Sequence, residues 1–221
     1  MKLLALETAN EHCSVSLFQD GHSKFFQLET RARAQTQAIL PMVEAGLNQL
    51  GWQVETLDAI AFSRGPGSFS GVRINAAVAQ ALAWSHDLPV VPVSTLQALA
   101  QRAYHQHGLT EVTTVIDARM NEVYIANYKL QDGLMQLVDT EQLKDYLSAA
   151  DLAQFSLVGS GAALLETPYT SYLDVQVSAV EIGEVASVLA QQKQWVDAAH
   201  ALPVYLRDNA WKKISEQGKA E

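Results

Sequence analysis

A glycine-rich segment, SRGPGSFSGVR over residues 63–73, is the part of the sequence whose residue types and spacing best suit chemistry. It comes close to three reaction motifs and matches none of them. A nucleophile elbow needs serine between its two glycines, and Phe69 stands at that position. A phosphate-binding P-loop continues with lysine, whereas Val72 follows the last glycine here. A dinucleotide fingerprint needs a glycine where Ser70 stands. We therefore assign no catalytic residue to this segment.

The same segment has the composition of a loop between a strand and a helix. Gly65 and Gly67 allow backbone dihedral angles that other residues avoid, and Ser68 can cap the helix that follows. Free N–H groups at a helix start suit a phosphate or a carboxylate, and Arg64 or Arg73 would add positive charge. The alternative is a tight structural turn that binds no ligand. The spacing alone leaves both interpretations open.

Two acidic residues at the ends of expected strands are the best-placed pair in the chain. Glu7 and Asp117 lie where ligands of open α/β sheets gather, and together they could hold a magnesium ion through water. The alternative is that each acid caps a turn and faces solvent. The loop and the two strand ends supply the candidate nucleotide or anion contacts: Glu7, Arg64, Gly65, Gly67, Ser68, Asp117 and Arg119.

The histidines predict neither a metal site nor a catalytic triad. His105 and His107 are two positions apart, so on a helix they would point to different faces. No spacing ties a serine, a histidine and an aspartate together. Cys13 lies in an expected strand and is interpreted as a small buried hydrophobic residue. We expect no metal and no cofactor of the chain's own.

The charge balance limits the partners that the chain can bind by itself. Its 24 acidic residues outnumber 15 lysines and arginines, which gives a formal net charge of -9. Affinity for nucleic acid rests on basic residues that neutralise phosphates, so a role on RNA would need a basic partner. No apolar run reaches the roughly 18 residues of a membrane helix. The single cysteine suits a reducing compartment, and we expect a soluble cytoplasmic protein without membrane contacts.

Hydrophobic periodicity predicts a mixed α/β protein of two lobes, over 1–108 and a smaller 109–221. Ser94 is the expected N-cap of a helix that ends before Gly108. Pro41 should kink the first helix or mark its start. The expected strands cover 2–6, 14–18, 24–28, 59–62, 90–93 and 155–158, and the expected helices cover 35–50, 72–84, 94–104, 141–147 and 182–192.

The start of the second lobe repeats the start of the first. Residues 3–21 and 113–133 share an apolar strand that ends in an acid, an Asn-Glu pair, a second strand and a closing Gln-Asp-Gly. Such a repeat predicts a duplicated fold.

Taken together, these motifs resemble the TsaB family, also called YeaZ, over nearly the whole chain. The matching segments are LLALETANEHCSVSLF, QTQAILPMV, SRGPGSFSGVR, LPVVPVSTL, IDARMNEVY and PVYLR. The resemblance implies the duplicated actin, sugar kinase and Hsp70-like fold, which is RNase H-like. It also implies a role in making N6-threonylcarbamoyladenosine at position 37 of tRNAs that read codons beginning with A.

The resemblance implies that catalysis belongs to a partner. TsaB proteins pair with TsaD, a larger relative that binds the metal and transfers the threonylcarbamoyl group, and the ATPase TsaE joins that pair. TsaD-like proteins carry two histidines four apart on a helix, and here Thr95 and Leu99 occupy those places. We therefore expect a non-catalytic scaffold, with ATP or ADP and a divalent metal only in the partner or at the shared interface. The tRNA would be bound only indirectly, through the complex.

In this family the partner is held mainly by two helices of the N-terminal lobe, here about 35–50 and 72–84. Small residues on the second helix would allow close approach, and the same surface would make a homodimer when the partner is absent. The alternative is that both apolar stripes face their own sheet. The candidate interface residues are Ile39, Val43, Leu47, Arg73, Ala76, Ala77, Gln80 and Trp84.

Two departures from the family pattern separate this chain from typical members. Glu7 stands where aspartate is usual, which weakens nucleotide or magnesium binding in the first lobe, and Ala34-Gln35 replaces a Glu-His or similar pair. The alternative function is a phosphotransferase or ATPase of the same superfamily that uses Glu7, Asp117 and the loop. A peptidase has no nucleophile or metal constellation to support it.

Overall fold

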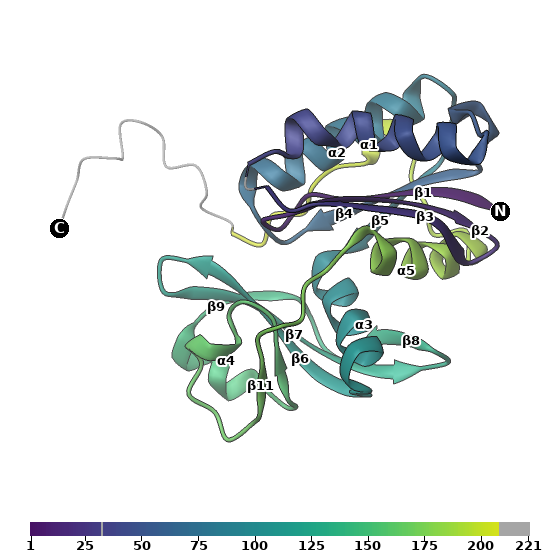
Figure 1. The fold of residues 1–221 in the computed structure, drawn as a ribbon. Helices are drawn as coiled ribbons and strands as arrows, with labels where there is room; N and C mark the ends of the chain where they lie inside the picture. Colours follow the sequence, from purple (N-terminus) through teal and green to yellow (C-terminus); the bar gives the residue numbers. More distant parts are fainter. Residues whose placement is uncertain (32, 208–221) are drawn as a thin grey trace, which may run out of the picture.

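The computed structural model of the chain describes residues 1–31 and 33–207. It consists of two lobes, each built around its own β-sheet, with one lobe above the other in Figure 1. Within these ranges we find no helix with the length and apolar character of a membrane span.

The sheet of the first lobe has the strand order β3-β2-β1-β4-β5. Its central strand is β1 (Lys2–Glu7). On one side, β2 (Cys13–Gln19) pairs antiparallel with β1 and with β3 (His22–Glu29). On the other side, β4 (Ala59–Gly65) pairs parallel with β1 and with β5 (Val90–Ser94).

Helices cover both faces of this sheet. In Figure 1, α1 (Gln35–Leu50) and α2 (Phe69–Trp84) lie together on one face, and α5 (Ala179–Gln191) lies on the other. Because side chains alternate along a strand, Leu4 and Leu6 of β1 pack with the α1 and α2 side, whereas alternate residues pack with α5. The apolar run at the N-terminus is therefore buried on both faces.

The sheet of the second lobe has the order β11-β10-β6-β7-β8. Its central strand β6 (Glu111–Arg119) pairs antiparallel with β7 (Glu122–Gln131), which pairs antiparallel with β8 (Leu134–Leu137). On the other side of β6, β10 (Leu157–Val158) pairs parallel with β6 and with β11 (Ser171–Tyr172).

Two further helices complete the second lobe. The helix α3 (Thr95–His107) packs against this sheet and against α5, and one hydrophobic cluster runs through both lobes at this contact. The opposite face carries α4 (Tyr146–Leu152), which follows the short strand β9 (Gln142–Asp145). Short 3-10 turns lie at Val54–Thr56, Ala162–Leu164 and Ala198–His200 and are labelled η1, η2 and η3.

The two sheets have the same topology, so the predicted duplication is confirmed. The order β3-β2-β1-β4-β5 of the first sheet corresponds to β8-β7-β6-β10-β11 of the second, which has β9 as an additional strand paired with β7. In each sheet the first three strands of the order pair antiparallel and the last two join in parallel. This is the duplicated α/β fold that the sequence predicts.

Three predictions about the elements need correction. The lobes are not the consecutive segments 1–108 and 109–221, because α5 and the segment after it return to the first sheet. Pro41 does not mark the start of α1, which runs through it from Gln35. The expected helix over 141–147 is divided between β9, which pairs with β7, and α4. Pairing with a neighbouring strand, which local sequence does not reveal, decides that last case.

The caps of α3 follow the prediction. The Ser94 hydroxyl accepts a hydrogen bond from the Gln97 N–H at 3.3 Å, and Gly108 ends the helix in the left-handed conformation. Ser94 is the last residue of β5, so its cap sets the point at which the chain leaves the first sheet and enters α3.

Candidate functional site

The glycine-rich loop connects β4 to α2 and packs directly on the turn that follows β1. A β-carbon at Gly67 would lie 2.5 Å from the carbonyl oxygen of Ala9, and one at Gly71 would lie 2.0 Å from that of Thr8. The Ser68 N–H donates to the same Ala9 oxygen at 2.7 Å. The glycines therefore allow the backbone of the loop to approach the backbone of the turn.

The candidate anion contacts of this loop do not converge on the start of α2. Ser68 is the N-cap residue, but its side chain makes no capping hydrogen bond. Arg64 turns toward the second lobe, where its Nη2 lies 3.2 Å from Oε2 of Glu141. Gly65 has a φ of 99°, and a β-carbon there would lie 3.2 Å from the carbonyl oxygen of Val204. Nucleotide or anion binding by the loop stays a prediction.

Glu7 caps the turn after β1, as the alternative interpretation has it, but it does not face solvent. Its side chain is buried, and Oε1 accepts hydrogen bonds from the N–H groups of Ala9 at 2.5 Å and Asn10 at 3.2 Å. Among the described residues, Oε2 has no hydrogen-bond partner. Burial raises the pKa of the Glu7 carboxyl to about 7, although the hydrogen bonds from the N–H groups of Ala9 and Asn10 act to lower it. Glu7 is thus a buried group that titrates near neutral pH.

Asp117 has the equivalent place in the second lobe and a different environment. Its Oδ1 accepts from the Arg119 N–H at 2.8 Å, and its Oδ2 lies 2.9 Å from Nη1 of the same arginine. The Ser160 hydroxyl accepts a hydrogen bond from the Asp117 N–H. Glu7 and Asp117 therefore each hold their own turn. Over 1–31 and 33–207, no three His, Cys, Asp or Glu side chains lie together as metal ligands would.

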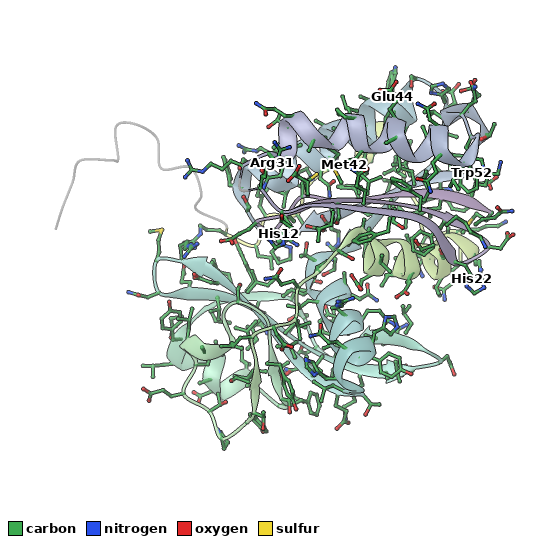
Figure 2. All side chains as sticks on the ribbon, viewed as in Figure 1. His12, His22, Arg31, Met42, Glu44 and Trp52 are labelled. Atoms are coloured by element: carbon green, nitrogen blue, oxygen red, sulfur yellow. The ribbon has the colours of Figure 1, made fainter. Side chains whose placement is uncertain are left out.

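Half of the candidate interface residues lie in the core of the first lobe. Ile39, Val43, Leu47 and Ala76 are buried, so here the apolar stripes of α1 and α2 face their own sheet. Figure 2 shows the same division on α1, with Met42 between helix and sheet and Glu44 on the outer side. The expectation that these four side chains form an exposed contact surface is wrong, since an amphipathic stripe packs on its own sheet first.

The other four candidates, Arg73, Ala77, Gln80 and Trp84, lie along the outer side of α2. Trp84 is 71% exposed. A cavity of about 470 Å³ lies between this side and the C-terminal segment, lined by Arg73, Ala76, Ala77, Gln80, Leu202, Pro203 and Tyr205. Small side chains at the centre and a large exposed aromatic ring at the end give this surface, which we call the α2 face, the character of a docking surface.

Comparison with known proteins assigns the chain to a family. The sequence is 40% identical to the tRNA threonylcarbamoyladenosine biosynthesis protein TsaB of Escherichia coli (strain K12), over 97% of this chain and 98% of that protein. The chain belongs to the TsaB family. TsaB of Haemophilus influenzae is 36% identical over 97% of both chains. The solved structure of YeaZ from Pseudomonas aeruginosa has a TM-score of 0.86 and 37% identity, covering 93% of this chain and 99% of that chain. The family model described as "TsaD: tRNA N6-adenosine threonylcarbamoyltransferase" matches residues 29–214.

The TsaB resemblance seen in the sequence is therefore confirmed, and the structure shows what fills the positions compared with TsaD. Thr95 and Leu99 are both buried on α3. Leu99 is part of the hydrophobic cluster that joins the lobes, and its methyl group would lie 2.6 Å from a β-carbon at Gly159. Leu99 therefore serves packing between the lobes, whereas the buried Thr95 hydroxyl has no hydrogen-bond partner among the described residues.

The segment after η3 is the part of the candidate site that sequence reasoning did not assign. The Val204 N–H donates to the carbonyl of Arg64 at 2.8 Å, and the Arg73 Nε donates to the Tyr205 hydroxyl at 2.9 Å. Arg207 then reaches the second lobe, where it donates to the Ala118 carbonyl at 3.2 Å and pairs with Glu122. The family motif PVYLR over 203–207 was the signal that could have found it.

Proposed function

We propose that this chain is a non-catalytic subunit that supports threonylcarbamoyl transfer to adenosine 37 of tRNAs reading codons that begin with A. The observation that carries the proposal is the full-length likeness to proteins named for tRNA threonylcarbamoyladenosine biosynthesis. In this proposal the chain works with a TsaD-like subunit that performs the transfer, and a TsaE-like ATPase joins the pair.

We propose the α2 face as the surface that binds the TsaD-like partner. It combines exposed small side chains with the exposed ring of Trp84, and both favour close helix packing. The same face would join two copies of the chain when the partner is absent.

Three features favour a non-catalytic role for this chain over a catalytic one. Thr95 and Leu99 are buried in packing. Glu7 is buried with its carboxyl directed to its own turn. The net charge of -9 disfavours direct binding of tRNA, so the tRNA contacts are assigned to the complex. ATP or ADP and a divalent metal would be bound by the partner or at the shared interface, and the complex would work in the cytoplasm.

Reconstitution of tRNA modification tests the proposal. Purified TsaD, TsaE and TsaC, which supplies threonylcarbamoyl-adenylate, are incubated with unmodified tRNA, with or without this chain, and the modified nucleoside is measured by mass spectrometry. We expect modification to depend on the chain. Full modification in its absence would overturn the proposal.

Two variants locate the partner surface within that assay. Trp84→Glu places a charge on the α2 face. We expect this variant to no longer support tRNA modification, and we expect the immobilised variant to no longer capture TsaD. Leu147→Glu is the matched control, because Leu147 is 81% exposed on α4 of the second lobe. Equal losses from both variants would place the contact elsewhere.

The alternative, a phosphotransferase or ATPase, has its own measurement. Titration of ATP and magnesium into the isolated chain by calorimetry should give no heat, and phosphate release should stay at background. Turnover by the isolated chain would favour the alternative, and sedimentation of the same sample measures the expected homodimer.

A further inference from the structure

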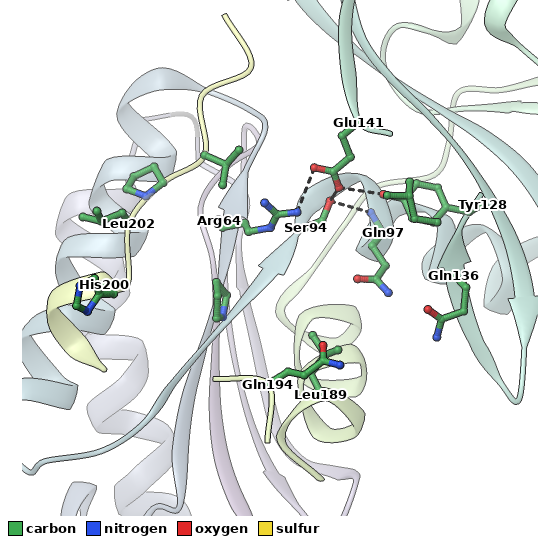
Figure 3. Close-up of a pocket in the computed structure, with 14 residues that line it drawn as sticks. Arg64, Ser94, Gln97, Tyr128, Gln136, Glu141, Leu189, Gln194, His200 and Leu202 are labelled. Carbon is green, nitrogen blue, oxygen red and sulfur yellow. Dashed lines mark hydrogen bonds and ion pairs between the residues drawn. The ribbon is translucent and has the colours of Figure 1, made fainter. Parts of the chain in front are cut away.

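A buried carboxylate, Glu141, is surrounded by three hydrogen-bond donors at the contact between the lobes. Its side chain is 8% exposed. The Arg64 guanidinium lies 3.2 Å from Oε2, the Tyr128 hydroxyl donates to Oε1 at 3.1 Å, and the Ser94 hydroxyl donates to the same oxygen. Figure 3 shows the three donors converging on this one group. A guanidinium with two hydroxyls is a donor set suited to carboxylates and phosphates.

The donors are held in place by the fold independently of Glu141. Arg64 is the second-last residue of β4, and its carbonyl accepts a hydrogen bond from the Val204 N–H at 2.8 Å. Ser94 belongs to β5 and caps α3. The ring of Tyr128 is fully buried on β7, and burial, followed by the charge of Glu141, raises the pKa of its hydroxyl well above 10. Tyr128 therefore stays protonated and keeps its hydrogen to donate.

Glu141, in contrast, lies on an exposed connection between β8 and β9. Val138 and Thr140 beside it are exposed, and Glu141 precedes the first residue of β9. Its side chain could leave the three donors for solvent without opening the core of either lobe. The position between the donors is thus an anion position that a side chain of the chain itself fills.

A cavity of about 630 Å³ opens beside this position. Figure 3 shows Gln97 and Gln136 on one wall, Leu189 and Gln194 on the floor and Leu202 on the opposite wall. This volume lies within the range of about 300 to 1,000 Å³ typical of small-molecule sites. Amide and aliphatic side chains suit the body of a ligand that has both polar and apolar parts.

We propose that Arg64, Ser94 and Tyr128 form a binding site for the carboxylate or phosphate head group of a small anionic ligand whose body occupies this cavity. Glu141 fills the head-group position until such a ligand displaces it. Without the Glu141 carboxylate, the Arg64 guanidinium, 29% exposed, lacks its ion-pair partner, and the hydroxyl groups of Ser94 and Tyr128 lack an acceptor. The head group of an incoming anion would replace the carboxylate as the ion-pair partner of Arg64 and as the acceptor for the two hydroxyl groups. The site is separate from the α2 face, and the proposal does not depend on the function proposed above.

Two probes separate the two head groups. Adenosine 5′-monophosphate presents a phosphate, and glutarate presents a carboxylate on a chain like that of glutamate. Each is titrated by calorimetry into the full chain and into Glu141→Ala, which vacates the head-group position. We expect at least one probe to bind Glu141→Ala about tenfold or more tightly than the unaltered chain, because the competing charge is gone.

Control variants assign any gain to this site. Adding Arg64→Met to Glu141→Ala should abolish the gain, since the guanidinium supplies the positive charge. Glu166→Ala removes the same charge from an exposed position of the second lobe and should bind as the unaltered chain does. Binding of one probe identifies its head group, and binding of both identifies a general anion site. No gain for either probe, or a gain that survives Arg64→Met, would overturn the proposal.

Two measurements keep the test valid if Glu141→Ala does not fold. Glu141→Gln keeps the shape of the side chain and removes its charge, and we expect a smaller gain in affinity from it. In the unaltered chain, amide chemical shifts are followed during titration with each probe to high millimolar concentration. Changes at Ser94 and Gln97 support the site. Unchanged shifts at both with both probes would overturn it.

Discussion

Each lobe has a glycine-containing turn after the strand that pairs parallel with its central strand, and only one of the two turns leads into a long helix. In the first lobe, the loop after β4 is followed by the 16 residues of α2. In the second lobe, Gly159-Ser160-Gly161 after β10 is followed by the three residues of η2. A β-carbon at Gly161 would lie 3.0 Å from the Asp117 N, much as one at Gly71 would meet Thr8. Close contact with the central strand therefore requires glycine in both lobes, with or without a ligand.

The difference between the lobes lies in what covers the end of the central strand. The start of α2 packs on the turn after β1 and Glu7 is buried, whereas Asp117 keeps 20% of its side-chain surface exposed and pairs with Arg119. The long helix also gives the first lobe an outer α2 face for which the second lobe has no counterpart among the described residues. The same topology thus yields a buried acid and an outer face on a long helix in one lobe and, among the described residues, neither in the other.

The contact between loop and turn gives the largest expected effect. Gly71→Ala would put a β-carbon 2.0 Å from the Thr8 carbonyl oxygen. The atom it meets belongs to the backbone, which moves less readily than a side chain. We expect a loss of about 3 kcal/mol or more in the free energy of unfolding, although alanine is the better helix former. Urea denaturation followed by circular dichroism measures it.

Two other glycines serve as controls for that contact. Gly21→Ala meets no atom within 4 Å and strains only a φ of 79°, so we expect a cost of about 1 kcal/mol. Gly161→Ala should fall between them, because its nearest neighbour is the Val115 side chain at 2.8 Å, which can shift. A Gly71→Ala cost no larger than that of Gly21→Ala would show that the close approach is not needed.

The buried acid gives the next largest effect, and it depends on pH. The folded chain raises the pKa of Glu7 from 4.5 to about 7, so the folded state holds this proton more tightly than the unfolded state. Glu7 therefore leaves the free energy of unfolding unchanged at low pH, where it is protonated in both states. It lowers this free energy progressively as pH rises from about 4.5 through 7. Glu7→Gln removes this dependence. Relative to the unaltered chain, it should gain roughly 2 to 3 kcal/mol of stability between pH 5 and pH 8.

Comparing the two proteins at each pH removes the contribution of groups common to both. Glu184, whose pKa burial also raises to about 7, titrates in the same range and cancels. Asp117→Asn is the counterpart in the second lobe and should show no comparable gain over this range. A difference between Glu7→Gln and the unaltered chain that stays constant with pH contradicts the burial argument.

Local sequence carried enough information to predict the duplicated framework. Strand pairs, the Ser94 cap and the Gly108 end all depend on neighbours within a few residues, and all were predictable. The repeat at Glu7 and Asp117 predicted the common topology, because each acid accepts the N–H two residues further along. These features are set by backbone hydrogen bonding, which residue types and spacing reveal.

Burial at the site could not be predicted, because it depends on contacts between distant segments. The stripe of Ile39, Val43 and Leu47 is equally suited to a partner and to its own sheet, and only the assembled lobe decides for the sheet. Nothing near Glu7 in the sequence shows that its side chain is buried in the assembled protein. Glu141 was expected in a helix, and pairing of β9 with β7 places it between the lobes instead.

The α2 face gives an effect on partner binding and little effect on stability. We expect Trp84→Ala to weaken binding to TsaD by about 2 kcal/mol, or roughly 30-fold, as loss of an aromatic anchor does. Leu147→Ala removes a side chain that is also largely exposed, on the second lobe, and should change binding less than twofold. Surface plasmon resonance with immobilised TsaD measures both. A larger loss of affinity from Leu147→Ala than from Trp84→Ala would indicate that TsaD binds the second lobe and not the α2 face of the first.

The smallest expected effect concerns the exposed pair at the second strand end. The Arg119 side chain is 80% exposed, so its ion pair with Asp117 is well hydrated. Arg119→Met should cost less than about 0.5 kcal/mol, and 1 M salt should reduce even that difference. Thermal unfolding at low and high salt measures it, with Glu7→Gln beside it as the buried reference. A salt-resistant cost above about 1.5 kcal/mol would mean that the second strand end is as tightly held as the first. Burial at the first strand end and exposure at the second would then no longer explain why the two acids differ.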